Sequence, residues 1–264
     1  MHILSQYTVY VQLLVYGSVL VFFWFLEFLL YPGKIKEKTK HTFLNSKFIF
    51  LVLPIQILLS LVVFKVADWT NSNHWGLASF LPASLNVVLF FIAQFIMLDF
   101  FDYMYHIMMH KTPLFWKFHQ VHHSDMDVDI STTLREHPGE TFIRVTYFIL
   151  VVFIVGASPW VLIIKQFIQS FSNLVSHSKI VFPRKVNNIV SLIFVTPNTH
   201  RVHHHFELPH TDSNFGDTLA IWDRLFATFS NLTQNKIKCG LDTHMDSKEN
   251  LDFKNLLVRP FKKK

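Results

Sequence analysis

Residues 77–110 read LASFLPASLNVVLFFIAQFIMLDFFDYMYHIMMH. The first part, residues 77–101, is apolar and long enough, at about 1.5 Å per helical residue, to cross a hydrocarbon core of about 30 Å. The second part carries His106 and His110, and the i, i+4 spacing places both rings on one helix face. The stretch therefore predicts a membrane helix that ends in two candidate metal ligands.

The composition is that of a membrane protein. Of the 264 residues, 51% are hydrophobic and only 16% are charged, so a bilayer accounts for the chain better than a soluble core. Neither a linker nor a low-complexity segment interrupts it. We expect one all-α domain over residues 1–264, a polytopic membrane helical bundle with a cytosolic, histidine-rich helical cap.

Further apolar segments flank the first one. Residues 7–30 and 48–66 are each long enough to cross the membrane, and residues 141–176 predict a helical hairpin that turns at residues 156–159. The arms of the hairpin are short, so it either spans the bilayer twice or re-enters and remains partly buried. Glu27 lies inside an apolar segment and should therefore face the protein or the cytosolic interface, and we favour a structural partner in the protein.

Basic residues predict the orientation. Five lysines between residues 34 and 47 are typical of a cytosolic loop. With the apolar segments as above, residues 102–140 and 177–264 fall on the same side. The net charge of +6 is explained by anionic lipid headgroups, and no nucleic-acid partner is expected.

Histidine is abundant, at 16 residues, whereas Cys239 is the one cysteine. This excludes a disulfide framework and a thiolate metal site. Two segments share one spacing, His119-Gln-Val-His122-His123 and His200-Arg-Val-His203-His204. On a helix, the three histidines of each segment lie on one face, and the adjacent pair can serve two metals or one metal at two angles.

With His106 and His110, the three boxes contain eight histidines. A single tetrahedral zinc needs three or four ligands, and a bis-histidine haem needs two. Two octahedral metals can use eight or more while keeping open positions, and all-nitrogen ligands favour iron. We therefore expect a site with two iron ions.

The chain resembles the fatty acid hydroxylase superfamily, also called the sterol desaturase family, over about residues 99–229. The resemblance rests on the three boxes HxxxH, HxxHH and HxxHH and on the segments around them. Arg135-Glu136-His137-Pro138-Gly139-Glu140 is similar to the RxHPxE segment of the family. Asn214-Phe215-Gly216 and the segment from Trp222 to Thr228 are similar to its closing motifs, with Ala227 in place of the usual glycine.

The resemblance implies a ninth ligand, His177, with Asn173 where some relatives have a further histidine. Residues expected to support or orient the ligand imidazoles are Asp99, Asp102, Glu140, Asn173, Asn198 and Asp223. For His137, two roles remain open, an additional ligand or a residue that fixes the loop before Pro138. No protein acid or base is assigned apart from the metal centre. His2, His41, His74 and His244 are expected in tails or surface loops.

The expected reaction is O2-dependent oxidation of a lipid C–H bond, either hydroxylation or desaturation. The lipid could be a sterol, a fatty acyl chain or a related molecule. The chain has no flavin, nicotinamide or cysteine-cluster motif, so electrons must come from a partner such as cytochrome b5, a ferredoxin or a rubredoxin-like carrier. The alternatives are a membrane zinc-dependent hydrolase, for which no HExxH motif is present, and a non-enzymatic metal- or haem-binding membrane protein.

Overall fold

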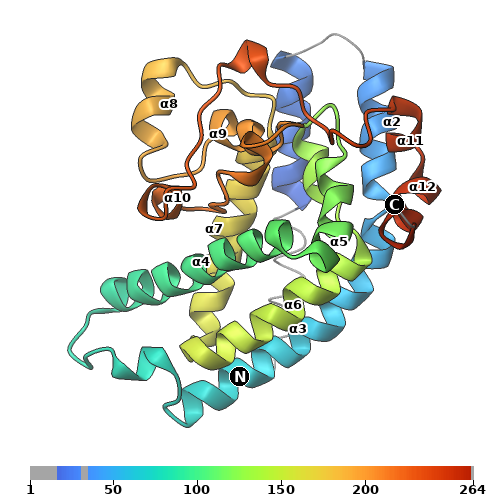
Figure 1. Cartoon of the computed structure of the whole chain (residues 1–264). Helices are drawn as coiled ribbons and strands as arrows, with labels where there is room; N and C mark the ends of the chain where they lie inside the picture. The colour runs from blue at the N-terminus through green and yellow to red at the C-terminus, as the bar shows by residue number, and fades with distance from the viewer. Residues whose placement is uncertain (1–16, 31–34, 263–264) are drawn as a thin grey trace.

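The computed structural model describes residues 17–30 and 35–262 (Figure 1). Its regular structure consists of α-helices and short 3-10 turns, and within these residues the β-structure is limited to two isolated bridges, Phe194 with Leu219 and His205 with Cys239. The expectation of an all-α fold is confirmed.

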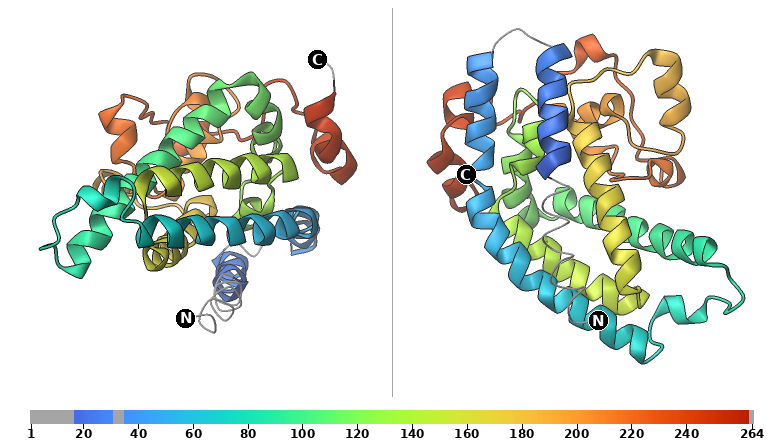
Figure 2. Two further views of the ribbon diagram at one scale, coloured as in Figure 1. Left: turned by 90° about the horizontal axis from the view of Figure 1, so that it is seen from below. Right: turned by 180° about the vertical axis from the view of Figure 1, so that it is seen from behind.

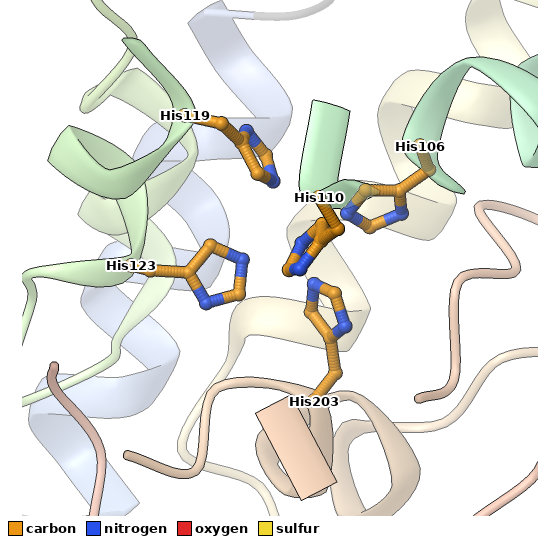
Figure 3. Close-up of side chains that lie close together, drawn as sticks. All are labelled: His106, His110, His119, His123 and His203. Atoms are coloured by element: carbon orange, nitrogen blue, oxygen red, sulfur yellow. The ribbon is translucent and has the colours of Figure 1, made fainter. Parts of the chain in front are cut away.

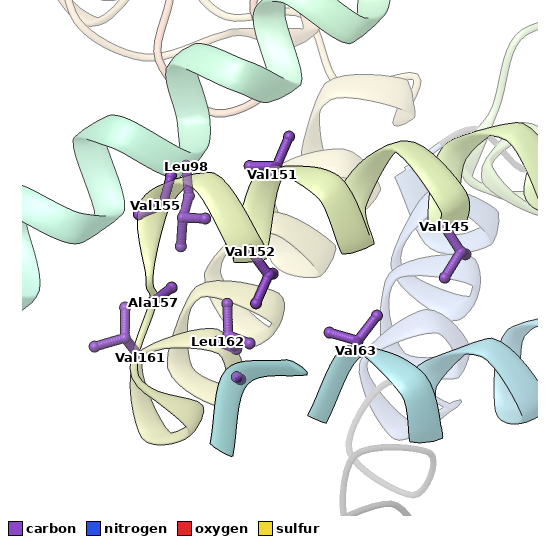
Figure 4. Packing of buried hydrophobic residues seen from close by; sticks show 10 residues of the cluster. Val63, Leu98, Val145, Val151, Val152, Val155, Ala157, Val161 and Leu162 are labelled. Atoms are coloured by element: carbon purple, nitrogen blue, oxygen red, sulfur yellow. The ribbon is translucent and has the colours of Figure 1, made fainter. Parts of the chain in front are cut away.

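Three helical regions in the described part are long and apolar enough to cross a membrane. They contain α3 (Ile49–Ser72), α4 (Val87–Lys111) and α6 (Pro138–Val155). A shorter apolar helix covers Gly17–Leu30, and the preceding part of the expected segment 7–30 lies outside the described residues. The long helices pack through small and branched side chains, among them Val63, Leu98 and Val152 (Figure 4).

Several expected boundaries were wrong. Residues 77–80 form a 3-10 turn, η1 (Leu77–Phe80), and α4 begins only at Val87. Pro82 interrupts the stretch, and the Asn86 side chain accepts hydrogen bonds from the Val88 and Leu89 amides, which caps the helix there. Helix α3 continues to Ser72, beyond the expected end at residue 66. The basic segment expected as a loop is a helix, α2 (Ile35–Ser46).

The expected hairpin is present, with α6 followed by α7 (Pro159–His177). The turn depends on Gly156, which has a φ of 68° and ends α6 in the left-handed region that glycine favours. A Cβ on Gly156 would lie 1.8 Å from the Trp75 carbonyl oxygen. The tip of the hairpin therefore packs directly against the backbone of the corner between α3 and α4.

The remaining elements form a cap at one end of the long helices (Figures 1 and 2). It begins with α5 (Pro113–His123), directly after α4. The other cap elements are η2 (Ile130–Leu134), α8 (Arg184–Val190), α9 (Pro197–His203), η3 (His210–Asp212), α10 (Ile221–Leu225), η4 (Gln234–Lys236), α11 (Ser247–Asn250), α12 (Phe253–Val258) and η5 (Arg259–Phe261). These segments surround the ends of α4 and α7.

Candidate metal centre

Four helices deliver the predicted ligands. The first box lies in the last turns of α4, the second fills the end of α5, His177 is the last residue of α7, and the third box occupies α9 with His204 as its C-cap. Both helices that carry HxxHH begin with proline, Pro113 and Pro197, whose fixed φ suits the first helical turn. The Thr196 side chain adds a capping box to α9.

The nine predicted ligand histidines lie in two groups. In each group the candidate ligand atoms all lie within 4.8 Å of one another. The five-histidine group, shown in Figure 3, contains His106, His110, His119, His123 and His203. The four-histidine group contains His122, His177, His200 and His204.

The adjacent histidines of each HxxHH box separate into different groups. His123 belongs to the five-histidine group and His122 to the other, with an angle of 81° between their rings. His203 and His204 divide in the same way, at 89°. The rings of His123 and His204 stack at 4.5 Å, so the two groups adjoin. Each HxxHH box thus contributes ligands to both groups and joins them.

In the five-histidine group, one ring nitrogen of every member except His123 faces a protein oxygen. Nδ1 of His106 lies 2.9 Å from the Phe215 carbonyl oxygen, Nδ1 of His119 lies 2.6 Å from Glu140, and Nδ1 of His203 lies 2.7 Å from the Ser213 carbonyl oxygen. An N–H that donates to such an oxygen leaves Nε2 with its lone pair directed inward. This is the tautomer that a metal requires.

The inward nitrogens lack protein partners. Nε2 of His110, His119 and His203 is buried without a hydrogen bond, an arrangement that costs free energy unless something binds there. In the four-histidine group, Nε2 of His177 lies 3.1 Å from that of His122 and 2.9 Å from that of His200. Zinc–imidazole bonds are about 2.1 Å long, so nitrogens at right angles around a similar first-row metal lie about 3.0 Å apart. The residues present therefore fit bound metal.

Burial favours the neutral form of the three histidines in the third box. Desolvation is the main cause that holds the pKa of His200, His203 and His204 well below its usual range, and neighbouring histidines add to the effect. A neutral imidazole is the form that binds a metal ion. The third box therefore presents uncharged nitrogen ligands at neutral pH.

Three of the residues expected to support the ligands are connected to them. Glu140 contacts His119 directly. Asp223 acts through the backbone, because its carboxylate accepts the Phe215 amide at 2.7 Å and the Phe215 carbonyl in turn faces His106. Asn173 contributes its main-chain carbonyl, 2.9 Å from Nδ1 of His177.

The hydrogen bonds found for Asp99, Asp102 and Asn198 differ from the expected ones. The Trp222 indole donates to Asp99 at 2.8 Å, and Asp102 forms an ion pair with Lys165, which is buried in α7 and needs a counter-charge. Asn198 exchanges two hydrogen bonds with the backbone of Phe182. These side chains hold α10, α7 and the segment before α8 in place, and the contacts found for them do not include a ligand imidazole.

Both ring nitrogens of His137 face backbone groups. Nδ1 accepts the Gly139 amide at 3.0 Å, and Nε2 lies 3.0 Å from the Leu257 carbonyl oxygen. His137 caps the N-terminus of α6 and ties it to α12. The contacts agree with the loop-fixing role and leave no nitrogen for a metal.

Sequence reasoning missed several supporting groups. Asp212 lies 3.3 Å from Nδ1 of His110, and the carbonyl oxygens of Ser213 and Phe215 face two other ligands. Every residue has a carbonyl group, so no sequence pattern marks these two. Asp212 could have been noticed only as an acidic residue shortly before the Asn214-Phe215-Gly216 segment.

His41 was expected at the surface, and this was wrong. It is buried, with Nε2 2.9 Å from Asp125 and Nδ1 3.3 Å from Asp129. Because α2 is a helix rather than a loop, His41 and Asn45 lie on one face and pack against the segment that follows the second box. The partner expected for Glu27 exists, since its carboxylate accepts the Lys179 amide at 2.7 Å and the Lys38 ammonium at 2.7 Å.

Comparison with known families matches the fatty acid hydroxylase model to residues 91–228, which is more than half of the chain and contains all three boxes. The chain belongs to the fatty acid hydroxylase family. The expected resemblance over residues 99–229 is thereby confirmed.

Among curated proteins, the ornithine lipid hydroxylase OlsE of Rhizobium tropici is 26% identical over 232 residues, covering 88% of this chain and 67% of that protein. The alkylglycerol monooxygenase of Homo sapiens is 33% identical over 155 residues, or 58% of this chain. That of Xenopus tropicalis is 33% identical over 137 residues. The chain spans only 33% and 29% of these two monooxygenases. No solved structure matches the chain significantly.

Proposed function

We propose that this chain is a membrane-bound, O2-dependent monooxygenase that hydroxylates a C–H bond of a lipid, with two iron ions held by its nine histidines. The observation that carries the proposal is the division of these histidines into a group of five and a group of four. A single metal ion would leave the buried imidazoles of the other group without a metal to bind.

Nitrogen ligands without thiolate favour iron, copper or zinc over magnesium or calcium. Iron bound at the two groups would supply the O2 activation that C–H oxidation requires, and family membership supports iron. The surrounding residues would orient ligands of the five-histidine group. Glu140, Asp212 and the carbonyl groups of Ser213 and Phe215 hold the Nδ1 side of four ligands.

The substrate class follows from the relatives and from the membrane helices. OlsE is a hydroxylase of ornithine lipid and the other relatives are monooxygenases of alkylglycerol, so both act on lipids. We propose a membrane lipid as the substrate of this chain, and hydroxylation rather than desaturation as the reaction. The three apolar helices would keep the site beside the bilayer.

The electrons would come from a separate carrier, such as cytochrome b5, a ferredoxin or a rubredoxin-like protein. We propose that the cap faces the cytosol, because α2 at its edge carries Lys36, Lys38 and Lys40. An acidic carrier would be attracted to such a face.

Lipid analysis of cells with and without the chain tests the reaction. One lipid class should gain the mass of one oxygen atom, and loss of two hydrogen atoms would instead indicate desaturation. His203→Ala should abolish the product while the protein remains in the membrane, whereas His244→Ala, outside both groups, should retain it. Full activity of His203→Ala would contradict the proposed ligand set.

Metal analysis tests the alternatives. Protein purified from iron-replete cells should contain two irons for each chain. One zinc for each chain under these conditions would support the hydrolase instead. Two irons without an oxygenated lipid would favour a metal-binding protein that is not an enzyme.

A further inference from the structure

A patch of exposed apolar side chains covers one flank of the cap. It lies on the end of α8, the segment after it and α10, outside the three candidate membrane spans. We call it the cap patch and define it by Ile189, Leu192, Ile193, Phe194, Leu225 and Phe226. Ile189 and Leu225 are each 70% exposed, and Phe226, the least exposed of the six, is at 49%. An apolar surface of this kind on a folded domain marks an interaction site.

The parts of the cap patch are tied to one another. The Ala220 amide, just before α10, donates to the Ile193 carbonyl at 2.8 Å. Arg224 in α10 donates to the Ser191 carbonyl at 2.9 Å. Both ribbon views place α8 and α10 on the same flank of the molecule (Figures 1 and 2). The patch is therefore one surface.

The cap patch continues onto a membrane helix. The ring of Phe226 lies 5.9 Å from that of Phe100 in α4. Earlier residues of α4, such as Val88 and Ile92, are exposed apolar side chains as well. The apolar surface thus extends from a helix that can cross the bilayer to the flank of the cap.

The charge around the patch indicates its occupant. Helix α8 begins with Arg184 and Lys185, both exposed, and residues 180–206 contain neither Asp nor Glu. Exposed apolar residues beside cations are typical of surfaces that lie in the interface of an anionic membrane. A second copy of the chain fits less well, because a two-fold contact through the patch would bring the same cations close to each other.

We propose that the cap patch is an interfacial membrane-binding surface, embedded in the headgroup region of the leaflet beside the cap, with Arg184 and Lys185 on anionic lipid headgroups. Phe194 of the cap patch lies two residues before Thr196, the N-cap of the helix that carries the third histidine box. Lipid binding there would hold the metal centre against the membrane. The proposal does not depend on the reaction that the metals carry out.

Fluorescent labels at single cysteines test the proposal. In the full chain with Cys239→Ser, Ile189→Cys marks the patch, and Lys248→Cys in α11 is a matched exposed control on the cap. Each variant is labelled with an environment-sensitive dye and placed in vesicles of phosphatidylcholine and phosphatidylglycerol. Lipids brominated near the headgroup should quench the label at residue 189 several-fold more than the label at residue 248. Iodide in the water should show the opposite order.

Two results would overturn the proposal. Equal access of iodide to both labels would show that the patch is in water. A label at residue 189 that neither iodide nor brominated lipid reaches would show that protein, such as a second copy, covers the patch. Metal content equal to that of the parent confirms that each labelled variant is folded.

A charge-reversed variant tests the headgroup contact. R184E/K185E in the Ile189→Cys protein should lower lipid quenching in vesicles that contain phosphatidylglycerol and leave it unchanged in pure phosphatidylcholine. Unchanged quenching in both would show that anionic headgroups are not bound at these residues.

Discussion

At the scale of single residues, the candidate metal centre depends on which nitrogen of each imidazole faces the protein. Nδ1 of His106, His119 and His203 meets an oxygen, and the other nitrogen is free for a metal. Because these contacts select the tautomer, the oxygens that support the ligands should affect metal affinity.

His177 is a candidate metal ligand, whereas His137 is not, and metal content should distinguish the two. His177→Ala would remove one of the four members of its group, so we expect the iron content to fall toward half, with the five-histidine group still loaded. His137→Ala removes contacts with backbone groups and with the Phe118 and Phe261 rings, but none with a ligand, and should keep the full iron content. Metal analysis of the two purified variants measures this. A full complement of iron in His177→Ala would contradict its assignment.

The Glu140 carboxylate orients His119. Glu140→Gln should lower the affinity for one metal by roughly 10–100-fold, because the amide is a weaker acceptor for the imidazole N–H. Glu136→Gln is a matched control, since Glu136 contacts Thr141 and Arg144 instead of a ligand. Chelator competition measures the affinity. Equal affinities in both variants would show that the Glu140 contact has no effect on binding.

At the scale of elements, the hairpin of α6 and α7 determines where His177 lies. The hairpin begins beside the second box, and its tip packs against the α3–α4 corner at Gly156. The return along α7 then brings His177 to the group that contains His122. Any change at the tip should therefore be transmitted to the ligand end of α7.

Gly156→Ala tests this element. Alanine at a φ of 68° costs about 1–2 kcal/mol, and contact with the Trp75 carbonyl adds to the loss. We expect a lower melting temperature in detergent and a loss of metal from the four-histidine group. Gly17→Ala is the control, because a Cβ there has no neighbour within 4 Å. A melting temperature unchanged by Gly156→Ala would contradict the role of the tip.

At the scale of the whole molecule, the long helices separate the cap from the corner between α3 and α4 (Figure 2). If α3 and α4 cross the bilayer, these two ends lie on opposite sides of it. Ala83 is exposed at the corner and Lys248 is exposed on the cap.

Labelling of single cysteines at these positions tests the prediction that the cap faces the cytosol. In the Cys239→Ser background, a membrane-impermeant maleimide added to intact cells should label Ala83→Cys and not Lys248→Cys. After the membrane is opened, both should react, which confirms that both sites are accessible. Labelling of Lys248→Cys alone in intact cells would place the cap outside the cytosol.

Local patterns in the sequence were sufficient to predict the helices and the candidate ligands. Apolar length predicted the membrane helices, and the spacing in HxxHH placed three histidines on one helix face, because both properties arise within a few turns of one helix. Helix boundaries were predicted less accurately where a capping residue such as Asn86 begins the helix inside a continuous apolar run.

Only the tertiary structure decided how the histidines are shared. The spacing allowed each adjacent pair to serve one metal or two, and the packing of α4, α5, α7 and α9 assigned His123 and His203 to one group and His122 and His204 to the other. It also buried His41 against Asp125 and directed Asp99 and Asp102 away from the ligands. These outcomes depend on contacts between segments far apart in the chain, which the periodicity of a single helix does not encode.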